Sequence, residues 1–169
     1  ITLLKHADRV KVACLAQLVN VIAPIMTANG GPAWRQTIFY PFLHASQYGR
    51  GTSLQTVVKS PVYDTRDFME VPFLDATAVY NAAQQELSIF AVNRDQAGEL
   101  ALSCDLRSFG AFSGVTHIVL DSKDPKAVNT ASAQPVKPRE ARGAALDGGR
   151  LSVRLPPLSW NVLRLAVRK

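Results

Sequence analysis

A chain of 169 residues, 47% of them hydrophobic, is long enough for one domain of ordinary size or for one small domain and part of another. Its formal net charge of +6, from 19 basic and 13 acidic residues, is compatible with nucleic-acid binding. The densest basic stretch, residues 137–154, lacks the aromatic side chains that stack on bases, so no nucleic-acid partner is expected. Every apolar run ends before the roughly 18 residues that a membrane helix needs, so no membrane association is expected.

The chain opens with a helical pattern and continues with a buried-strand pattern. Residues 1–8 bunch their apolar side chains as on one helix face, and His6 and Arg9 follow where cations suit a helix C-terminus. Because these residues read as late helical turns, we expect a fragment whose N-terminal part is missing. Residues 10–18 are almost continuously apolar, which is typical of a strand covered on both faces of a parallel sheet.

A long apolar loop and a second helix follow. The loop after Asn20 carries the turn signal at residues 29–32; it is too long for a simple hairpin and too apolar for a solvated loop, so we expect it to line a site. Residues 37–48 return to helical spacing, and glycines end the helix. This order predicts the final βα unit of an α/β sheet or barrel, whose ligands bind at the C-terminal ends of strands, where Gln17 lies.

Beyond Gly51 the pattern is β throughout, with short alternating or apolar runs separated by turn residues, as in an antiparallel sandwich. Hairpin or loop signals lie at residues 81–85 and 94–98. The polar, proline-containing stretch 121–149 predicts a long connection at the edge of the sandwich. The final run, 150–169, turns through two prolines into a strand that should close the second sheet. The runs expected to carry strands are 53–65, 78–94, 99–109, 116–122 and 150–169.

Three segments carry a resemblance to a known family: CLAQLVNVIAPIMT, GGPAWRQTIFYPFLHASQYGRG and LPPLSWNVLRL. They resemble the C-terminal portion of the α-L-arabinofuranosidases of glycoside hydrolase family 51. The resemblance implies the end of a (β/α)8 TIM barrel followed by an all-β C-terminal jelly-roll-like sandwich. It divides the chain into a barrel remnant, 1–53, and an antiparallel β-sandwich domain, 54–169. In this frame the end of the seventh barrel helix, the eighth strand and the eighth helix would correspond to residues 1–9, 10–17 and 37–48.

The same resemblance implies a retaining mechanism in which two glutamates act as nucleophile and acid/base. Such a site needs two carboxyl groups about 5 Å apart at the ends of barrel strands. The only carboxylate before Tyr63 is Asp8, which precedes the expected strand. We therefore expect no catalytic residue in this chain, both catalytic glutamates upstream of Ile1, and no hydrolysis by these 169 residues alone.

Three residues are candidates for substrate binding. Gln17 matches a glutamine that in this family hydrogen-bonds the arabinofuranose beside the cleaved bond, and an amide suits a sugar hydroxyl because it both donates and accepts. From the residues alone, satisfying backbone groups at a strand end is the more ordinary role for Gln17, and the resemblance favours substrate contact. Asn20 is a weaker candidate that could touch sugar or cap backbone groups. Trp34 could stack on a sugar face or pack the loop onto the helix and the sandwich.

The remaining reactive side chains are expected to be structural. The histidines are dispersed and lack a local carboxylate pattern, so no metal site and no cofactor are expected. Cys14 and Cys104 have no CxxC spacing and read as buried thiols in a reducing compartment. Trp160 follows the Pro-Pro turn and is expected in the sandwich core. The three histidines are His6, His44 and His117.

The resemblance implies the tail of a cytoplasmic, exo-acting α-L-arabinofuranosidase that releases terminal non-reducing α-L-arabinofuranosyl residues from arabinan, arabinoxylan or arabino-oligosaccharides. Its partners would be that glycan, the missing N-terminal barrel of the same protein and, since the family's enzymes are typically oligomers with hexamers common, further copies of the chain. The alternative is a non-catalytic β-sandwich that binds carbohydrate or is purely structural. Residues 1–51 discriminate between the two, because the apolar strand expected within them, residues 10–18, is buried only against neighbouring strands.

Overall fold

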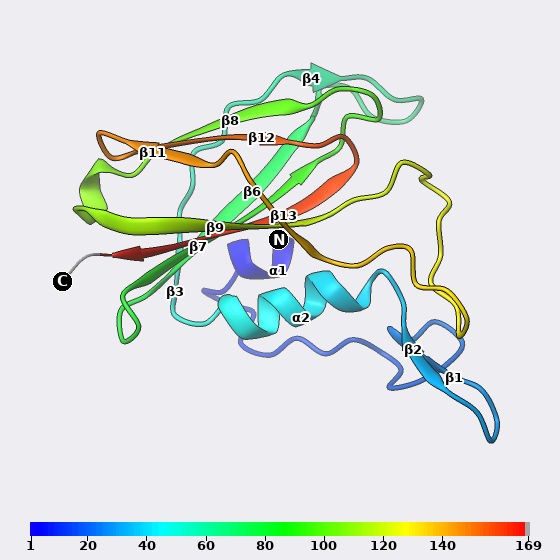
Figure 1. Cartoon of the computed structure of the whole chain (residues 1–169). Coiled ribbons are helices and arrows are strands. Elements are labelled where there is room, and N and C mark those ends of the chain that lie inside the picture. The colour runs from blue at the N-terminus through cyan, green and yellow to red at the C-terminus, as the bar shows by residue number, and fades with distance from the viewer. Residues whose placement is uncertain (168–169) are drawn as a thin grey trace.

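Two antiparallel β-sheets of unequal size face each other (Figure 1) in the structure, a computed structural model that describes residues 1–167. The larger sheet has six strands in the order β10 (Arg139–Ala141), β9 (Phe112–Leu120), β13 (Ser159–Val167), β7 (Glu86–Asn93), β6 (Leu74–Asn81) and β3 (Thr52–Leu54). The smaller sheet has three strands in the order β11 (Ala145–Asp147), β12 (Arg150–Leu155) and β8 (Leu100–Asp105). The antiparallel β pattern expected beyond Gly51 is confirmed as far as residue 167.

Alternation along the strands builds the core between the sheets. In β12 every second side chain is buried, because successive residues of a strand point to opposite faces. The inward side chains of β12 pack against those of β8, β7 and β13, and the outward ones are polar and exposed. The buried members of β12 are Leu151, Val153 and Leu155.

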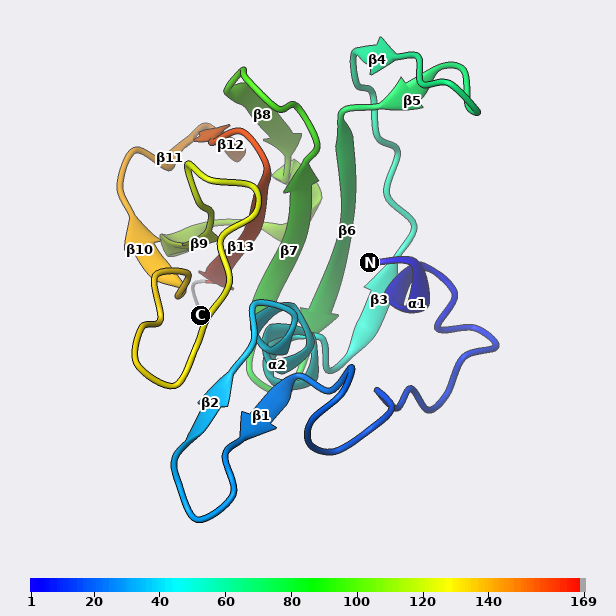
Figure 2. The ribbon, with the colours of Figure 1, turned by 90° about the vertical axis from the view of Figure 1, so that its right-hand side faces the viewer.

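The larger sheet is buried on its outer face as well. The helices α1 (Thr2–Lys5) and α2 (Phe39–Tyr48) lie on the side of this sheet that faces away from β8 and β12 (Figure 1 and Figure 2). Phe90 and Val162 point to this outer face and form a cluster with Leu4 and Tyr48 of the two helices. The helices expected within residues 1–8 and 37–48 are therefore confirmed, and together with the sandwich they form a packed layer.

The local sequence explains the bounds of α2. Pro41 lies in its first turn, where a missing amide hydrogen leaves no helical bond unmade. Gly49 ends the helix, and its amide donates to the Ala45 carbonyl oxygen at 2.9 Å. A Cβ at Gly49 would stand 2.5 Å from that oxygen, so only glycine fits this stop without displacement.

The strand expected at residues 10–17 is not formed in this chain. Residues 10–18 form neither helix nor strand, and Val12 and Leu18 are 81% and 80% exposed. The expected burial of Cys14 is wrong for the same reason, since its side chain is exposed. A strand of a parallel sheet is held by hydrogen bonds to neighbouring strands, and the described residues supply none at this place.

Two further expectations need correction. The apolar loop judged too long for a hairpin contains a short one, with strands β1 (Ile25–Thr27) and β2 (Ala33–Arg35). The last strand, β13, lies in the middle of the larger sheet, hydrogen-bonded to β7 and β9, and does not close the second sheet. It is central because its mostly apolar sequence suits burial on both faces, between the core and the helices.

The connections agree with the turn signals. The tight turn 82–85 joins β6 to β7, and the loop 94–99 leads from β7 to β8. The stretch 121–138 is an irregular connection that reaches β10 at the edge of the larger sheet, as expected, although the remainder to residue 149 adds β10 and β11. A separate two-stranded ribbon, β4 (Val62–Tyr63) and β5 (Val71–Pro72), and a 3-10 turn, η1 (Arg107–Phe109), complete the elements. Within residues 1–167 neither helix is long and apolar enough to cross a membrane.

Candidate substrate-binding segment

The segment 17–36 holds all three residues proposed for substrate binding. Gln17 is exposed at its start, and the chain then turns sharply at Asn20 and Val21, whose φ angles are 62° and 56°. A positive φ is uncommon for asparagine and rare for a β-branched residue such as valine. The turn is therefore a strained conformation that the surrounding contacts must hold.

Asn20 supplies those contacts. Its side-chain oxygen accepts from the Thr27 amide at 2.7 Å, and its side-chain nitrogen donates to the Thr27 hydroxyl at 2.8 Å. Its own amide donates to the Ile25 carbonyl oxygen at 2.8 Å. The structure thus places Asn20 in the backbone-capping role, tying the turn to strand β1.

The hairpin β1–β2 carries Trp34 back toward the sandwich. Met26 lies opposite Trp34 across the two strands, and the Gln36 amide donates to the Pro24 carbonyl oxygen at 2.8 Å to close the base. Trp34 is half-buried, and its indole nitrogen donates to the backbone oxygen of Asn129 at 3.0 Å. The indole therefore packs the loop onto the sandwich, with its only hydrogen-bond donor used there.

Asn129 is a residue that the sequence gives no reason to select. It lies in the irregular connection after β9, far from Trp34 along the chain, and its side chain is 1% exposed. The side-chain nitrogen of Asn129 donates to the Arg35 carbonyl oxygen at 3.0 Å. A polar stretch rich in turn residues carries no periodic signal that could distinguish this asparagine from its neighbours.

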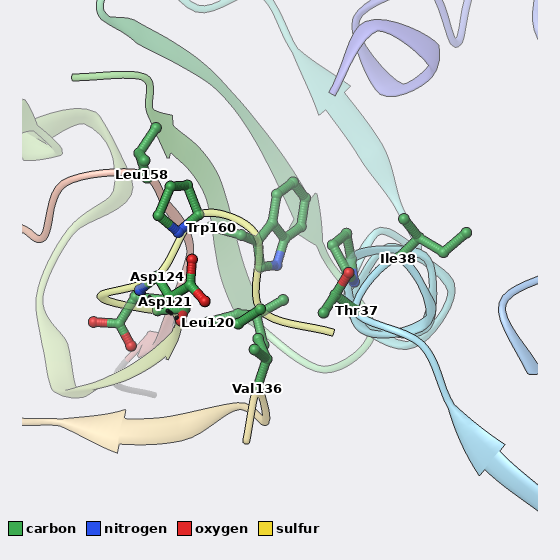
Figure 3. Close-up of a pocket in the computed structure, with 12 residues that line it drawn as sticks. Thr37, Ile38, Leu120, Asp121, Asp124, Val136, Leu158 and Trp160 are labelled. Atoms are coloured by element: carbon green, nitrogen blue, oxygen red, sulfur yellow. Dashed lines mark hydrogen bonds between the residues drawn. The ribbon is translucent and has the colours of Figure 1, made fainter. Parts of the chain in front are cut away.

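A pocket of about 360 Å3 opens between the start of α2 and the connection after β9 (Figure 3). Trp160 and Val136 form its apolar wall, and Asp121 and Asp124 stand at its rim. The Asp121 carboxylate is paired with the Arg139 guanidinium at 2.6 Å. The pocket thus combines an aromatic surface with hydrogen-bond acceptors, and it shares the connection 121–138 with the hairpin.

The histidines have structural positions. His44 is 5% exposed, and its Nδ1 accepts from the indole nitrogen of Trp160 at 3.1 Å. Burial lowers the pKa of His44 below its ordinary value, which keeps the ring neutral and able to accept. His117 is 2% exposed and its Nε2 lies 3.0 Å from the Asn161 side-chain oxygen. The pKa of His117 is also lowered, mainly by burial. The hydrogen bond to Asn161 raises this pKa, and the positive charge of Arg139 lowers it further.

Trp160 and Cys104 are partly buried. The Trp160 ring packs on Phe90 with centroids 5.8 Å apart, as expected for a core residue, and Trp160 also lines the pocket. Burial raises the pKa of the Cys104 thiol to about 11, so this thiol stays protonated at neutral pH. Among residues 1–167 no group of three or more histidine, cysteine or acidic side chains is placed to hold a metal ion.

The carboxylates of the sandwich serve ion pairs and turns. Glu86 accepts two hydrogen bonds from Arg164, at 2.9 and 2.6 Å. The Asp95 side chain accepts from the amides of Ala97 and Gly98, and these bonds lower the pKa of its carboxyl group. Both acids stabilise local structure, which is the role expected for acids on the faces and turns of a sandwich.

Comparison with known proteins agrees with this architecture. The family model for the alpha-L-arabinofuranosidase C-terminal domain matches residues 1–159. The chain is 58% identical over 165 residues to the intracellular exo-alpha-(1→5)-L-arabinofuranosidase of Halalkalibacterium halodurans, covering 98% of this chain and 33% of that protein. It is 50% identical to an intracellular exo-alpha-(1→5)-L-arabinofuranosidase of Bacillus subtilis, with the same two coverages, 98% and 33%.

A solved structure of a family 51 alpha-L-arabinofuranosidase from Bifidobacterium longum superimposes with a TM-score of 0.88 at 39% identity, covering 98% of this chain and 32% of that chain. This chain thus spans about a third of the length of the curated relatives it matches. The match to the family model covers both helices and the sandwich as far as Ser159, the first residue of β13. The chain therefore belongs to the alpha-L-arabinofuranosidase C-terminal domain family.

Proposed function

We propose that this chain is the C-terminal part of a retaining, exo-acting α-L-arabinofuranosidase of glycoside hydrolase family 51. The protein would act in the cytoplasm on terminal non-reducing α-L-arabinofuranosyl residues of arabinan, arabinoxylan or arabino-oligosaccharides. The 58% identity to an intracellular exo-arabinofuranosidase, extending over 98% of the chain, is the observation that carries this proposal. Both catalytic glutamates would lie upstream of Ile1, in a barrel that this chain completes.

The exposed apolar segment supports a missing barrel. Large hydrophobic side chains gather in the stretch between the two helices and are left exposed in the described chain. Residues 10–17 would become the eighth barrel strand once neighbouring strands supply hydrogen bonds and cover both faces. In this division residues 1–53 belong to the barrel and residues 54–169 to the sandwich. The exposed side chains are Val12, Leu15, Leu18, Val19, Val21 and Ile22.

A carbohydrate-binding or purely structural module would have no use for that apolar segment. Contiguous exposed apolar surface of this kind marks an interface, and here it immediately precedes the hairpin that carries Trp34. The sandwich itself would then brace the barrel through α2, and further copies of the protein would assemble into an oligomer, for which a hexamer is one candidate size.

The activity test compares the full-length protein with the 169-residue chain. We expect the full-length protein to hydrolyse p-nitrophenyl α-L-arabinofuranoside and the 169-residue chain to be inactive, because the two carboxyl groups of a retaining site would lie outside it. Hydrolysis by the 169-residue chain would overturn the proposal, as would an inactive full-length protein. Binding of arabinoxylan by residues 54–169 in a gel-shift assay would instead favour a binding module.

Gln17 is proposed to bind the arabinofuranosyl group at the edge of the active site. Its position at the end of the proposed eighth strand supports this role, because barrel enzymes place ligands at the C-terminal ends of their strands. In the full-length protein, Gln17→Ala should lower kcat/KM about tenfold, as expected for a lost hydrogen bond of about 1.4 kcal/mol. The matched control is Gln96→Ala, which truncates an exposed glutamine in the loop between β7 and β8. Equal kinetics for the two variants would remove Gln17 from the site.

A further inference from the structure

A buried asparagine of the sandwich holds the hairpin that follows Gln17. Asn129 uses its backbone oxygen to accept from the indole of Trp34, and its side-chain nitrogen to donate to the Arg35 carbonyl oxygen, both at 3.0 Å. The connection that carries Asn129 lies beside β2 in both views (Figure 1 and Figure 2). Strand β2 is thus fixed to the sandwich through its adjacent residues Trp34 and Arg35.

Asn129 is itself rigidly held. Its side-chain oxygen accepts from the Val136 amide at 3.0 Å, and its side-chain nitrogen also donates to the Val136 carbonyl oxygen at 2.8 Å. Val136 packs with Tyr40 of α2 and with Leu120 at the end of β9. The hydrogen bonds of Asn129 are therefore anchored to both the helix and the larger sheet, and a buried amide with its hydrogen bonds made has little freedom to shift.

The hairpin transmits this fixation toward Gln17. Strand β2 pairs with β1, and Thr27 of β1 holds Asn20 through the side-chain bonds described above. Asn20 begins the strained turn with Val21, only three residues after Gln17. A strained turn persists only where its surroundings fix it, and here the surroundings are the hairpin and, behind it, Asn129.

We propose that Asn129 is a positioning residue: from the sandwich, through the hairpin β1–β2 and the Asn20 turn, it sets where Gln17 stands at the substrate site. This inference rests on the proposed function for its kinetic consequence. It assigns the sandwich a part in substrate positioning, because without Asn129 the strand β2 loses its side-chain anchor to the connection 121–138. Small displacements of positioning groups lower rates strongly, since about 1 Å of misplacement costs up to about a hundredfold.

The experiment uses the full-length protein and three variants. Asn129→Ala removes the donor to Arg35 and leaves the Trp34 bond to the backbone. Trp34→Phe removes the indole donor and keeps a ring. Val153→Ala, in the core between the sheets and 5% exposed, is the matched control, because it destabilises the sandwich without touching the hairpin. Each variant is measured at a temperature well below its own Tm, by steady-state kinetics and by hydrogen exchange.

We expect Asn129→Ala to lower kcat/KM about tenfold or more and Val153→Ala to leave it within about twofold of wild type. Amides of residues 20–36, that of Thr27 among them, should exchange faster in Asn129→Ala and at the wild-type rate in Val153→Ala. Combining Asn129→Ala with Trp34→Phe should cost less in kcat/KM than the product of the single effects, since both variants release the same strand.

Two results would overturn the inference: equal kcat/KM for Asn129→Ala and Val153→Ala, or unchanged exchange over residues 20–36 in Asn129→Ala. A wild-type protein without arabinofuranosidase activity would refute the proposed function. The exchange measurement would still decide whether Asn129 holds the hairpin, because it requires no substrate. The two failures are therefore distinguishable.

Discussion

Replacing Phe90 with alanine tests whether the helices are bound to the sandwich as one packed unit. Phe90 is 0% exposed and lies on the outer face of the larger sheet, between that sheet and the helices. Its ring lies 5.8 Å from that of Trp160, centroid to centroid, and it packs in a cluster with Val79 and Val162. Removing the ring leaves a cavity on a central strand, where the hydrogen-bonded sheet resists collapse.

The magnitude follows from that rigidity. Truncation of a fully buried phenylalanine costs about 3–5 kcal/mol of unfolding free energy, and the upper part of this range applies where neighbours cannot move in. Phe90→Leu keeps most of the volume and should cost about 1–1.5 kcal/mol. The matched control is Phe68→Ala in the loop between β4 and β5, where the side chain is 70% exposed and the expected change is within about 0.5 kcal/mol.

Urea unfolding of the 169-residue chain, followed by tryptophan fluorescence, measures these differences. The sequence has two tryptophans, and one of them, Trp160, packs directly on Phe90, so the signal reports on this region. If Phe90→Ala cost no more than Phe68→Ala, the outer face of the sheet would not be covered by α1 and α2, and the packed arrangement described above would be refuted.

The other predictions concern pH and thiol reactivity. Burial lowers the pKa of His44 and of His117 in the folded state, so the unfolded chain binds more protons below its ordinary histidine pKa of about 6.5. The stability that the neutral histidines contribute is therefore fully present above about pH 6.5 and is lost as the pH falls toward their pKa values in the folded state. A series of Tm measurements from about pH 7.5 to 5 would show this loss. Replacing both histidines with glutamine should flatten the dependence of Tm on pH, and an unchanged slope would contradict the role given to these two histidines. Cys14 should react quickly with a maleimide in the 169-residue chain, whereas Cys104, with a pKa of about 11, should react slowly. In the full-length protein Cys14 should become protected by neighbouring barrel strands, and rapid labelling there would contradict the proposed strand.

Much of the sandwich could be predicted from local sequence. Strands such as β12 alternate buried and exposed side chains, and the helix α2 has helical spacing with a proline at its start and a glycine at its end. These signals depend on residues a few positions apart, so one sequence suffices to detect them. The same holds for the position of Gln17 at the end of an apolar run, although its role remains a prediction.

Local composition shows which segments are apolar and where the chain turns, and these signals predict an antiparallel β-domain preceded by a short helical part. The contacts of each segment, in contrast, follow from the fold of the whole chain. Residues 10–18 have the composition of a doubly covered strand, yet residues 11–18 are exposed here, because a strand forms only against neighbouring strands. The bond between Trp34 and Asn129 joins residues 95 positions apart, and no local pattern encodes such a pairing. The spacing of apolar residues indicates how much of a segment is suited to burial. Which other segment covers it depends on the packing of the whole chain.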